Sequence, residues 1–328
     1  MAILGDQVSQ IIARELVPSP SFAEEVKEGL TRNPKSLPCR LFYDSTCSAL
    51  FEEITRLPEY YLTRTELAIL SDRSEEIAHA VGPAITVVEL GAGTATKTCT
   101  LLTALSHRQR RVPYFSVDIS PAGLNEARER VQSQCPRVAV RPVLADFSER
   151  FAFLQDIPER TLVLYLGSSI GNFDPEAAVE MLTQIRQQLT AGDALLLGTD
   201  LVKDGSILLP AYGDEQGVTE RFNKSILARL NRDLGANFDL DSFRHIARWN
   251  PEQSRMEIYL EGLRPQTVDV ALLSLRVQFA NGERIHTENS YKYTIPMVRT
   301  ILEPAGFPLT RSWFDERHWF ALHLARAD

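Results

Sequence analysis

The chain has 328 residues, of which 44% are hydrophobic and 24% are charged, and its formal net charge is −8. This length can bury a large core and allows two domains of ordinary size, and the composition is typical of a globular protein rather than a disordered or fibrous one. Binding to nucleic acid normally relies on clustered Lys and Arg, so the acidic balance argues against DNA or RNA as a partner.

Neither a membrane anchor nor a cysteine framework is indicated. No apolar run approaches the roughly 20 residues that cross a bilayer, and the opening MAILGDQVSQII lacks a basic leader and a sustained apolar core. We therefore expect a cytoplasmic protein without membrane contact. The cysteines form no C-x-x-C pair, which predicts reduced thiols rather than a zinc site or disulfides. They are Cys39, Cys47, Cys99 and Cys135.

The first two thirds of the chain predict a helical opening followed by an alternating segment. Residues 1–62 are expected to be mainly helical, and from about residue 64 short apolar runs alternate with longer amphipathic ones. The apolar runs predict strands at 84–90, 112–119, 138–147, 161–169 and 193–201. This alternation predicts an α/β fold with a doubly wound parallel sheet and helices on both faces.

The remainder is expected to begin with a helix and continue as strands. The strands are predicted at 255–262, 270–280 and 283–293. The last two flank Asn281-Gly282, a strong hairpin signal, so we expect them to pair. The segments after residue 290 then predict a helix and two closing strands, 310–316 and 318–325.

These patterns predict two domains that are discontinuous in sequence. Residues 63–201 and 293–328 are expected to form the doubly wound domain. Residues 1–62 and 202–292 are expected to form a second, smaller α+β domain.

A glycine-rich turn joins the first predicted strand of the sheet to the next helix. Gly91 and Gly93 allow the backbone to pass close to a ligand. A lone G-x-G is weak evidence, and the dinucleotide fingerprint requires a third glycine where this chain has Thr96. A nicotinamide or flavin cofactor is therefore disfavoured.

The same turn resembles the first motif of class I S-adenosylmethionine-dependent methyltransferases, because an acid precedes the glycines in residues 89–93. That resemblance implies a ribose contact for Asp118 and an adenine site at Asp146 and Phe147. Lys97 is a candidate for the cofactor carboxylate, and an exposed lysine is the alternative. Alternatively, the glycines relieve a crowded turn and the acids merely end strands.

Over nearly its whole length the chain resembles the histidine-specific methyltransferase family, which also contains fungal enzymes acting on tryptophan derivatives. The motifs that carry the resemblance are LFYDSTCSALFEEITRLPEYYLTRTE, ELGAGTATKT, YLGSSIGNF, PAYGD and HTENSYKY. The resemblance implies three methyl transfers from S-adenosylmethionine to the α-amine of L-histidine, giving hercynine and S-adenosylhomocysteine. We expect a monomer without a metal. The alternatives are another aromatic amino acid such as tryptophan, or a protein that binds the cofactor without catalysis.

The resemblance also assigns contacts at the reacting end of the amino acid. Tyr61, Asn172 and Tyr212 are expected to hold its carboxylate and amine, with Asn172 and Tyr212 orienting the amine for reaction. Tyr43 and Gly167 are expected to line the cofactor, and Gly167 also borders the substrate. Asn172 could alternatively cap the helix that follows it. No His–Asp dyad is apparent, so we predict no dedicated general base.

A predicted strand carries the residues that the resemblance assigns to the imidazole. Side chains at i, i+2 and i+4 share a face of a strand, so His286, Glu288 and Ser290 are expected to point to one side. The resemblance implies that Glu288 and Ser290 bind the two ring nitrogens. It gives Ile258 a place in the same pocket and His286 no role. A solvated strand face is the alternative for Glu288.

Overall fold

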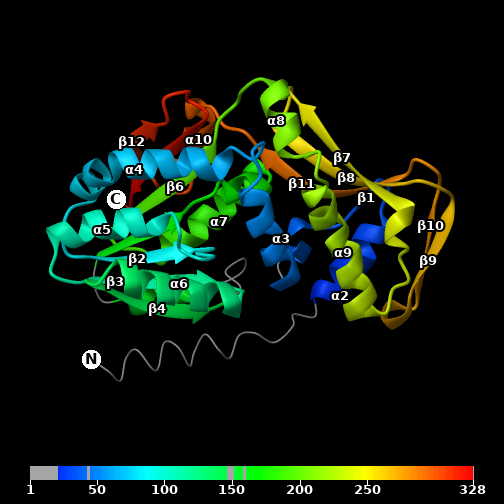
Figure 1. Ribbon diagram of the computed structural model, residues 1–328, viewed down its shortest axis with the longest axis horizontal. Helices are drawn as coiled ribbons and strands as arrows, with labels where there is room; N and C mark the ends of the chain where they lie inside the picture. The colour runs from blue at the N-terminus through cyan, green and yellow to red at the C-terminus, as the bar shows by residue number, and fades with distance from the viewer. Residues whose placement is uncertain (1–20, 43–44, 146–150, 158–159, 328) are drawn as a thin grey trace. The chain divides into compact units, whose positions relative to one another are not determined.

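The computed structural model describes residues 21–42, 45–145, 151–157 and 160–327, and these divide into two compact units (Figure 1). Unit 1 contains Leu62–Val202 and the chain from Lys292 onward, and unit 2 contains the described residues before Leu62 together with Lys203–Tyr291. In these described residues no helix is both long and apolar enough to cross a membrane.

Unit 1 is built on a seven-stranded sheet in which only β13 runs against its neighbours. The strands in spatial order are β12 (Leu309–Phe314), β13 (Phe320–Arg326), β6 (Ala194–Asp200), β5 (Arg160–Tyr165), β2 (Ile85–Leu90), β3 (Val112–Asp118) and β4 (Val138–Leu144). The order reverses between β2 and β5, which is the switch point where doubly wound sheets bind ligands. The predicted α/β fold class is therefore confirmed.

Helices cover both faces of this sheet. They are α4 (Leu62–Val81), α5 (Thr98–Arg108), α6 (Pro121–Gln134), α7 (Pro175–Gln187) and α10 (Ile295–Leu302). Helix α5 contacts α4 and α6, whereas α7 contacts α10 (Figure 1). Right-handed crossovers that progress in opposite directions from the switch point put α5 and α7 on opposite faces. Strands β2 and β6 are consequently buried along their whole length, which fits their largely apolar sequences.

The five strands predicted between residues 84 and 201 all form, with differences at their ends. The fourth stops at Tyr165 because Gly167 and Ser168 adopt positive φ angles of 76° and 62°. Both closing strands also form as predicted. The helix predicted after residue 290 begins only at Ile295, where the Thr294 side chain caps it.

Unit 2 contains a four-stranded sheet, a separate two-stranded sheet and helices. The strands of the first sheet are β1 (Lys35–Ser36), β11 (Arg284–Tyr291), β8 (Arg255–Gly262) and β7 (Phe243–Asn250), in that order, and the second sheet pairs β10 (Leu275–Phe279) with β9 (Gln266–Val270). The helices are α2 (Ser21–Thr31), α3 (Ser45–Thr55), α8 (Gly205–Ala211) and α9 (Val218–Leu234). The apolar stripe of α9 packs with buried residues of β8 and β11 in the core of this unit.

Short 3-10 helices complete the described chain. They are η1 (Cys39–Phe42), η2 (Ala152–Asp156), η3 (Ser169–Asn172), η4 (Leu240–Ser242) and η5 (Ala271–Leu273).

The predicted pairing of residues 270–280 with 283–293 is wrong. A turn does form at Asn281-Gly282, since Glu283 N donates to Ala280 O at 3.2 Å and Gly282 has a φ of +78°. However, β10 pairs with β9, whereas β11 pairs with β8 and β1. The side chains of β10 explain this choice, because Val277 and Phe279 belong to the buried core of unit 2.

Candidate functional site

The glycine-rich turn of unit 1 lies at the carboxyl edge of the sheet, directly after β2. Gly91 and Gly93 have φ angles of +72° and +50°, which favour glycine. The N–H groups of Gly91 and Ala92 both donate to Val117 O, at 2.9 and 3.1 Å. A Cβ built on Gly93 would meet no atom within 4 Å, so the turn borders open space. This geometry leaves room for a ligand beside the backbone.

Asp118 ends the neighbouring strand β3 and fastens this turn. Its Oδ2 accepts from Gly93 N at 2.8 Å, and its Oδ1 accepts from Ser120 N at 2.9 Å. Each carboxylate oxygen can accept about two hydrogen bonds, so acceptor capacity remains for further donors. Asp146 and Phe147, the residues predicted for the adenine, lie outside the described residues.

Lys97 follows the turn and is paired with a buried acid that sequence analysis missed. Its ammonium forms an ion pair with Glu66, whose side chain is fully buried, while the Lys97 side chain is 22% exposed. Gly167 N donates to both carboxylate oxygens of Glu66, at 2.8 and 3.1 Å. Glu66 sits on the apolar stripe of α4 between Leu62 and Leu70, at helical spacing. An acid on the apolar face of an amphipathic helix is the sequence feature that could have identified Glu66 as a candidate.

The acid of the glycine motif faces the interior. Glu89 accepts a hydrogen bond from Thr98 Oγ1 at 2.6 Å and another from the hydroxyl of Tyr114. Burial raises the pKa of Glu89 to about 7, although both hydrogen bonds lower it. Glu89 therefore ties β2 to the beginning of α5 and to β3, and thereby supports the turn.

Gly167 and Asn172 lie after β5, at the same carboxyl edge. Asn172 ends η3, and the N-cap position of α7 belongs to Asp174. The alternative in which Asn172 caps α7 is therefore wrong. At the end of the adjacent strand β6, Lys292 Nζ and Asp200 Oδ2 lie 2.9 Å apart, and both side chains are fully buried. This ion pair fixes the point where the motif SYKY enters unit 1.

In unit 2, Tyr61 is held by a cation. Lys203 Nζ donates to the hydroxyl of Tyr61 at 2.8 Å and lies 4.6 Å from the centroid of its ring. Tyr61 is buried. Lys203 was not predicted, and an isolated lysine between strand and helix carries no sequence signal of this role. Tyr43 lies outside the described residues.

Two predicted substrate residues of unit 2 contact each other. The hydroxyls of Tyr212 and Ser290 lie 2.8 Å apart, and both residues are buried. Tyr212 occupies the C-cap of α8, and Ser290 lies near the end of β11. The fold of unit 2 thus brings together two residues that lie 78 positions apart in the sequence.

The prediction that His286, Glu288 and Ser290 share a face is correct only for the last two. Glu288 stands opposite Ile258, whereas His286 stands opposite Tyr259, because the register shifts between His286 and Glu288. Directly opposed residues project to the same face, and Ile258 and Tyr259 are successive residues of β8, so they project to opposite faces. The extra residue of this β-bulge turns His286 away from the other two.

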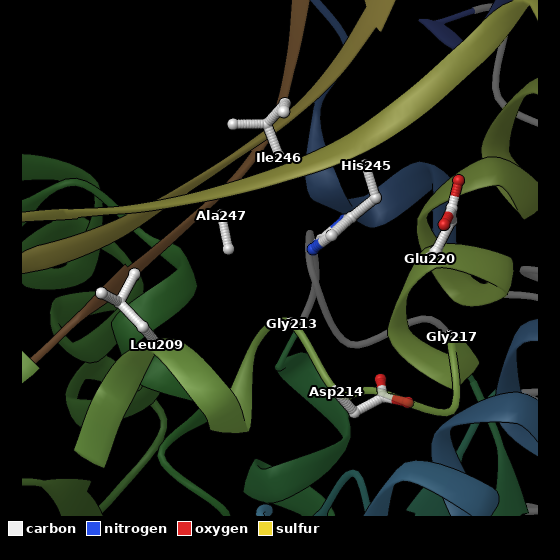
Figure 2. Close-up of a pocket in the computed structure, with 8 residues that line it drawn as sticks. All are labelled: Leu209, Gly213, Asp214, Gly217, Glu220, His245, Ile246 and Ala247. Carbon is white, nitrogen blue, oxygen red and sulfur yellow. The ribbon is translucent and has the colours of Figure 1, made fainter. Parts of the chain in front are cut away.

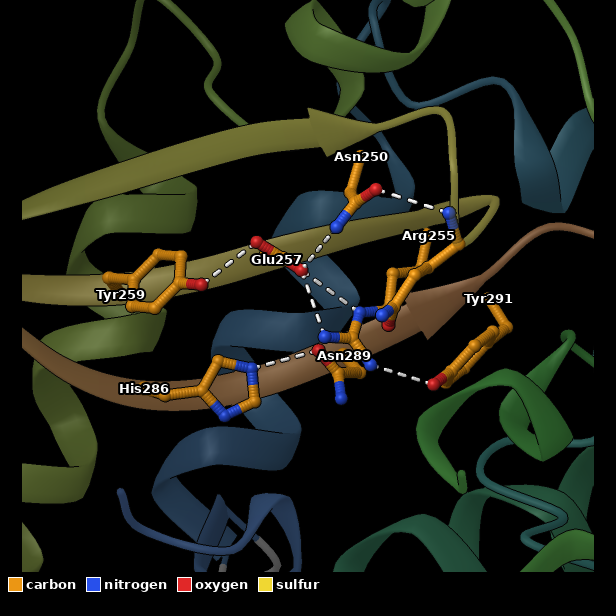
Figure 3. A network of polar contacts seen from close by, with 8 residues as sticks. Asn250, Arg255, Glu257, Tyr259, His286, Asn289 and Tyr291 are labelled. Carbon is orange, nitrogen blue, oxygen red and sulfur yellow. Dashed lines mark hydrogen bonds and ion pairs between the residues drawn. The ribbon is translucent and has the colours of Figure 1, made fainter. Parts of the chain in front are cut away.

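The face that carries His286 is filled by a polar network (Figure 3). His286 Nε2 and Asn289 Oδ1 lie 2.8 Å apart. Glu257 accepts from Asn250 at 2.9 Å, from Tyr259 at 2.9 Å and from Arg255 at 3.0 and 2.9 Å. Burial would raise the pKa of Glu257, but these hydrogen bonds outweigh it and hold the pKa below the ordinary value. This network stabilises the sheet.

A pocket of about 340 Å³ lies beside α8 and β7 (Figure 2). Its lining consists of Leu209, Gly213, Asp214, Gly217, Glu220, His245, Ile246 and Ala247. Asp214 accepts backbone hydrogen bonds at 2.8 Å from Val218 and Thr219, so it serves the start of α9. The predicted substrate side chains do not line this pocket. Within the described ranges, no cluster of three or more His, Cys, Asp or Glu could hold a metal ion.

Comparison with known proteins identifies the family. The family model for SAM-dependent, histidine-specific methyltransferases matches residues 22–327. A histidine N-alpha-methyltransferase of Mycolicibacterium smegmatis is 44% identical over 93% of this chain and 94% of its own length, and one of Mycobacterium tuberculosis has the same identity and coverage. Ergothioneine biosynthesis protein 1 of Schizosaccharomyces pombe is 32% identical over 94% of this chain and 40% of its own length. The chain belongs to the family of S-adenosylmethionine-dependent, histidine-specific methyltransferases.

Proposed function

We propose that this enzyme transfers methyl groups from S-adenosylmethionine to the α-amine of L-histidine, three times, giving hercynine. The carrying observation is the pairing of Glu288 with Ile258 on one face of the sheet that also presents Ser290, whose hydroxyl contacts Tyr212. The half-buried acid Glu288 thereby shares a face of β11 with Ser290, whose buried hydroxyl lies beside that of Tyr212. The identity of 44% to two histidine N-alpha-methyltransferases supports histidine as the substrate.

Each unit has its own role in this proposal. In this proposal the predicted domain of residues 63–201 and 293–328 binds S-adenosylmethionine, and the predicted domain of residues 1–62 and 202–292 binds the amino acid. The proposed cofactor residues are Tyr43, Gly91, Gly93, Lys97, Asp118, Asp146, Phe147 and Gly167. Support comes from the open space beside Gly93 and from the remaining acceptor capacity of Asp118.

The reaction is an in-line displacement at the methyl carbon of a sulfonium. The substrate ammonium must lose a proton before each transfer, since the attacking nitrogen needs a lone pair. Asn172 and Tyr212 orient the amine in this proposal, Tyr61 helps to hold the amino acid, and water accepts the proton. Such positioning can contribute roughly 7 to 11 kcal/mol. The trimethylated product has no lone pair, so the sequence of transfers ends there.

Selectivity rests on the imidazole. We assign one ring nitrogen to the Glu288 carboxylate and the other to the Ser290 hydroxyl, with Ile258 limiting the size of the ring pocket. A site built to hydrogen-bond a ring N–H rejects analogues that leave its buried polar groups unpaired. Phenylalanine is therefore expected to be a very poor substrate.

The test is a panel of the twenty amino acids incubated with pure enzyme and S-adenosylmethionine. Release of S-adenosylhomocysteine measures turnover, and mass spectrometry counts one, two or three added methyl groups. Trimethylated histidine as the main product supports the proposal. A preference for tryptophan would transfer the assignment to another aromatic amino acid, and a lack of turnover with every amino acid would favour cofactor binding without catalysis.

We further propose that the enzyme acts as a monomer in the cytoplasm.

A further inference from the structure

A network of buried and half-buried polar side chains in unit 2 connects two of the proposed substrate residues. We propose that Thr287, Asn223 and His245 are positioning residues, which set the places of Glu288 and Tyr212 without contacting the substrate. This inference rests on the proposed function, because it concerns how the same amino-acid site is held. It assigns a role to the bulge that separates His286 from Glu288.

The side-chain network begins at Thr287, the extra residue of the β-bulge. Thr287 Oγ1 donates to Asn223 Oδ1 at 2.8 Å and lies 3.2 Å from Ile258 O. Thr287 and Asn223 are each 1% exposed, so water cannot replace this partner without a rearrangement. The hydroxyl therefore anchors the extra residue of β11 to helix α9. Because Glu288 follows directly, its direction depends on this anchor.

Asn223 passes the connection from β11 to β7. Its Nδ2 lies 3.0 Å from Tyr259 O and 3.0 Å from His245 Nδ1. A carbonyl can only accept, so the amide nitrogen must face Tyr259 O, which leaves Oδ1 for Thr287. If the side-chain amide of Asn223 were flipped, its oxygen would face the carbonyl oxygen of Tyr259. The three bonds of Asn223 are thus satisfied in one orientation only.

His245 completes the connection to Tyr212. His245 Nε2 lies 2.7 Å from Tyr212 O and must carry the proton, because that carbonyl is an acceptor. His245 Nδ1 then presents its lone pair to Asn223. This tautomer requires a neutral ring, and burial lowers the pKa of His245. Figure 2 shows the ring projecting from β7 beside the loop that follows Tyr212.

The side-chain network forms a closed ring of interactions. Tyr212 is bound at its carbonyl by His245 and at its hydroxyl by Ser290, which lies three residues after Thr287 on β11. The orienting tyrosine and the imidazole-binding strand are therefore held by one network rather than by separate contacts. Loss of one member leaves a buried donor or acceptor unpaired and releases the others.

The first experiment compares Thr287→Val with Thr287→Ser in the full chain. Valine keeps the branched shape and removes the hydroxyl, whereas serine keeps the hydroxyl. We expect Thr287→Val to raise the KM for histidine about tenfold, because the buried Oδ1 of Asn223 loses its donor and Glu288 loses the anchor that sets its direction. The Kd for S-adenosylhomocysteine should stay within about twofold of wild type. Thr287→Ser should retain the wild-type KM.

A second variant covers the case in which Thr287→Val does not fold. His245→Phe keeps a flat ring at a half-buried position and removes both ring nitrogens, so it should raise the KM for histidine in the same way. Equal KM values for wild type and for a folded variant of either kind would overturn the inference, as would a parallel loss of cofactor affinity. The wild-type enzyme separates the two proposals. If it does not methylate histidine the proposed function fails, whereas normal wild-type turnover with unaffected variants refutes only the positioning role.

Discussion

The two units place their candidate residues by different means. In unit 1 the turn after β2 is shaped by glycine backbone angles, and Asp118 fastens it through two main-chain N–H groups. In unit 2 the corresponding groups are side chains, and a single bulge decides that Glu288 faces Ile258. Local backbone chemistry is visible in a sequence, whereas the direction of a side chain on a bulged strand depends on partners far along the chain.

The difference also extends to the supporting residues. Glu66 and Glu89 support the turn of unit 1 as buried acids, each with a cation or hydroxyl partner. The support in unit 2 is a neutral network through Asn223 and His245. Changes to these supporting residues of unit 1 should therefore act on cofactor binding or stability, and changes to the supporting network of unit 2 should act on the KM for histidine.

The largest expected effect tests this separation directly. Glu288→Ala should lower kcat/KM for histidine on the order of 10³-fold, about 4 kcal/mol, because the ring N–H loses its acceptor. The Kd for S-adenosylhomocysteine should change by less than about twofold. Steady-state kinetics and calorimetry measure the two quantities.

Glu288→Gln is the matched control, since it keeps the shape and one acceptor oxygen and removes the charge. It should lie between wild type and Glu288→Ala. Equal losses of histidine use and cofactor affinity in Glu288→Ala would mean that the residue is structural.

The next effect separates a structural from a cofactor-binding role of Lys97. Lys97→Met leaves the fully buried carboxylate of Glu66 without its cation and should lower the free energy of unfolding by about 3 kcal/mol. The double variant Lys97→Met/Glu66→Gln should recover most of this loss in urea titrations. If the double variant binds S-adenosylhomocysteine as tightly as Glu66→Gln alone, the proposed contact between Lys97 and the cofactor is wrong.

The buried carboxyl group of Glu89 in unit 1 should make the stability of the protein depend on pH. Its folded pKa of about 7 lies above the ordinary value of 4.5, so its favourable contribution is full below pH 4.5 and is lost as the pH rises through 7. The difference amounts to about 3 kcal/mol at 1.36 kcal/mol per pKa unit. As the pH rises from 4.5 to 8, the free energy of unfolding of Glu89→Gln should therefore increase relative to that of wild type. A difference in free energy of unfolding between variant and wild type that stays constant across this pH range, measured by urea titration, would refute the prediction.

Sequence patterns predicted most of unit 1 because its central strands β2, β5 and β6 are buried on both faces. An unbroken apolar run such as Leu162–Tyr165 in β5 needs no partner information to be recognised as a strand. Residues that follow such strands meet at one edge, so Gly91, Asp118 and Gly167 could be predicted to lie together. Glu66 escaped prediction because its partners, Lys97 and Gly167, lie 31 and 101 residues away.

Unit 2 was less predictable because its pairings depend on distant packing. The turn at Asn281-Gly282 was predicted, but the pairing of the strands beside it was decided by core contacts. Phe279 packs against Phe238 and Phe243, with ring centroids 6.1 and 5.4 Å apart. Strand β7 (Phe243–Asn250) went unpredicted because charged and polar residues interrupt its apolar pattern. The bulge at Thr287 likewise has no local signal.

The smallest expected effect is also the sharpest test of the bulge. His286→Ala removes a side chain two residues from Glu288, yet the structure puts it on the opposite face with Asn289. The lost hydrogen bond should lower the free energy of unfolding by about 1 kcal/mol, measured in urea. The KM for histidine should remain within about twofold of wild type. A tenfold rise in that KM would instead mean that His286 turns toward the substrate, as a regular strand without the bulge would require.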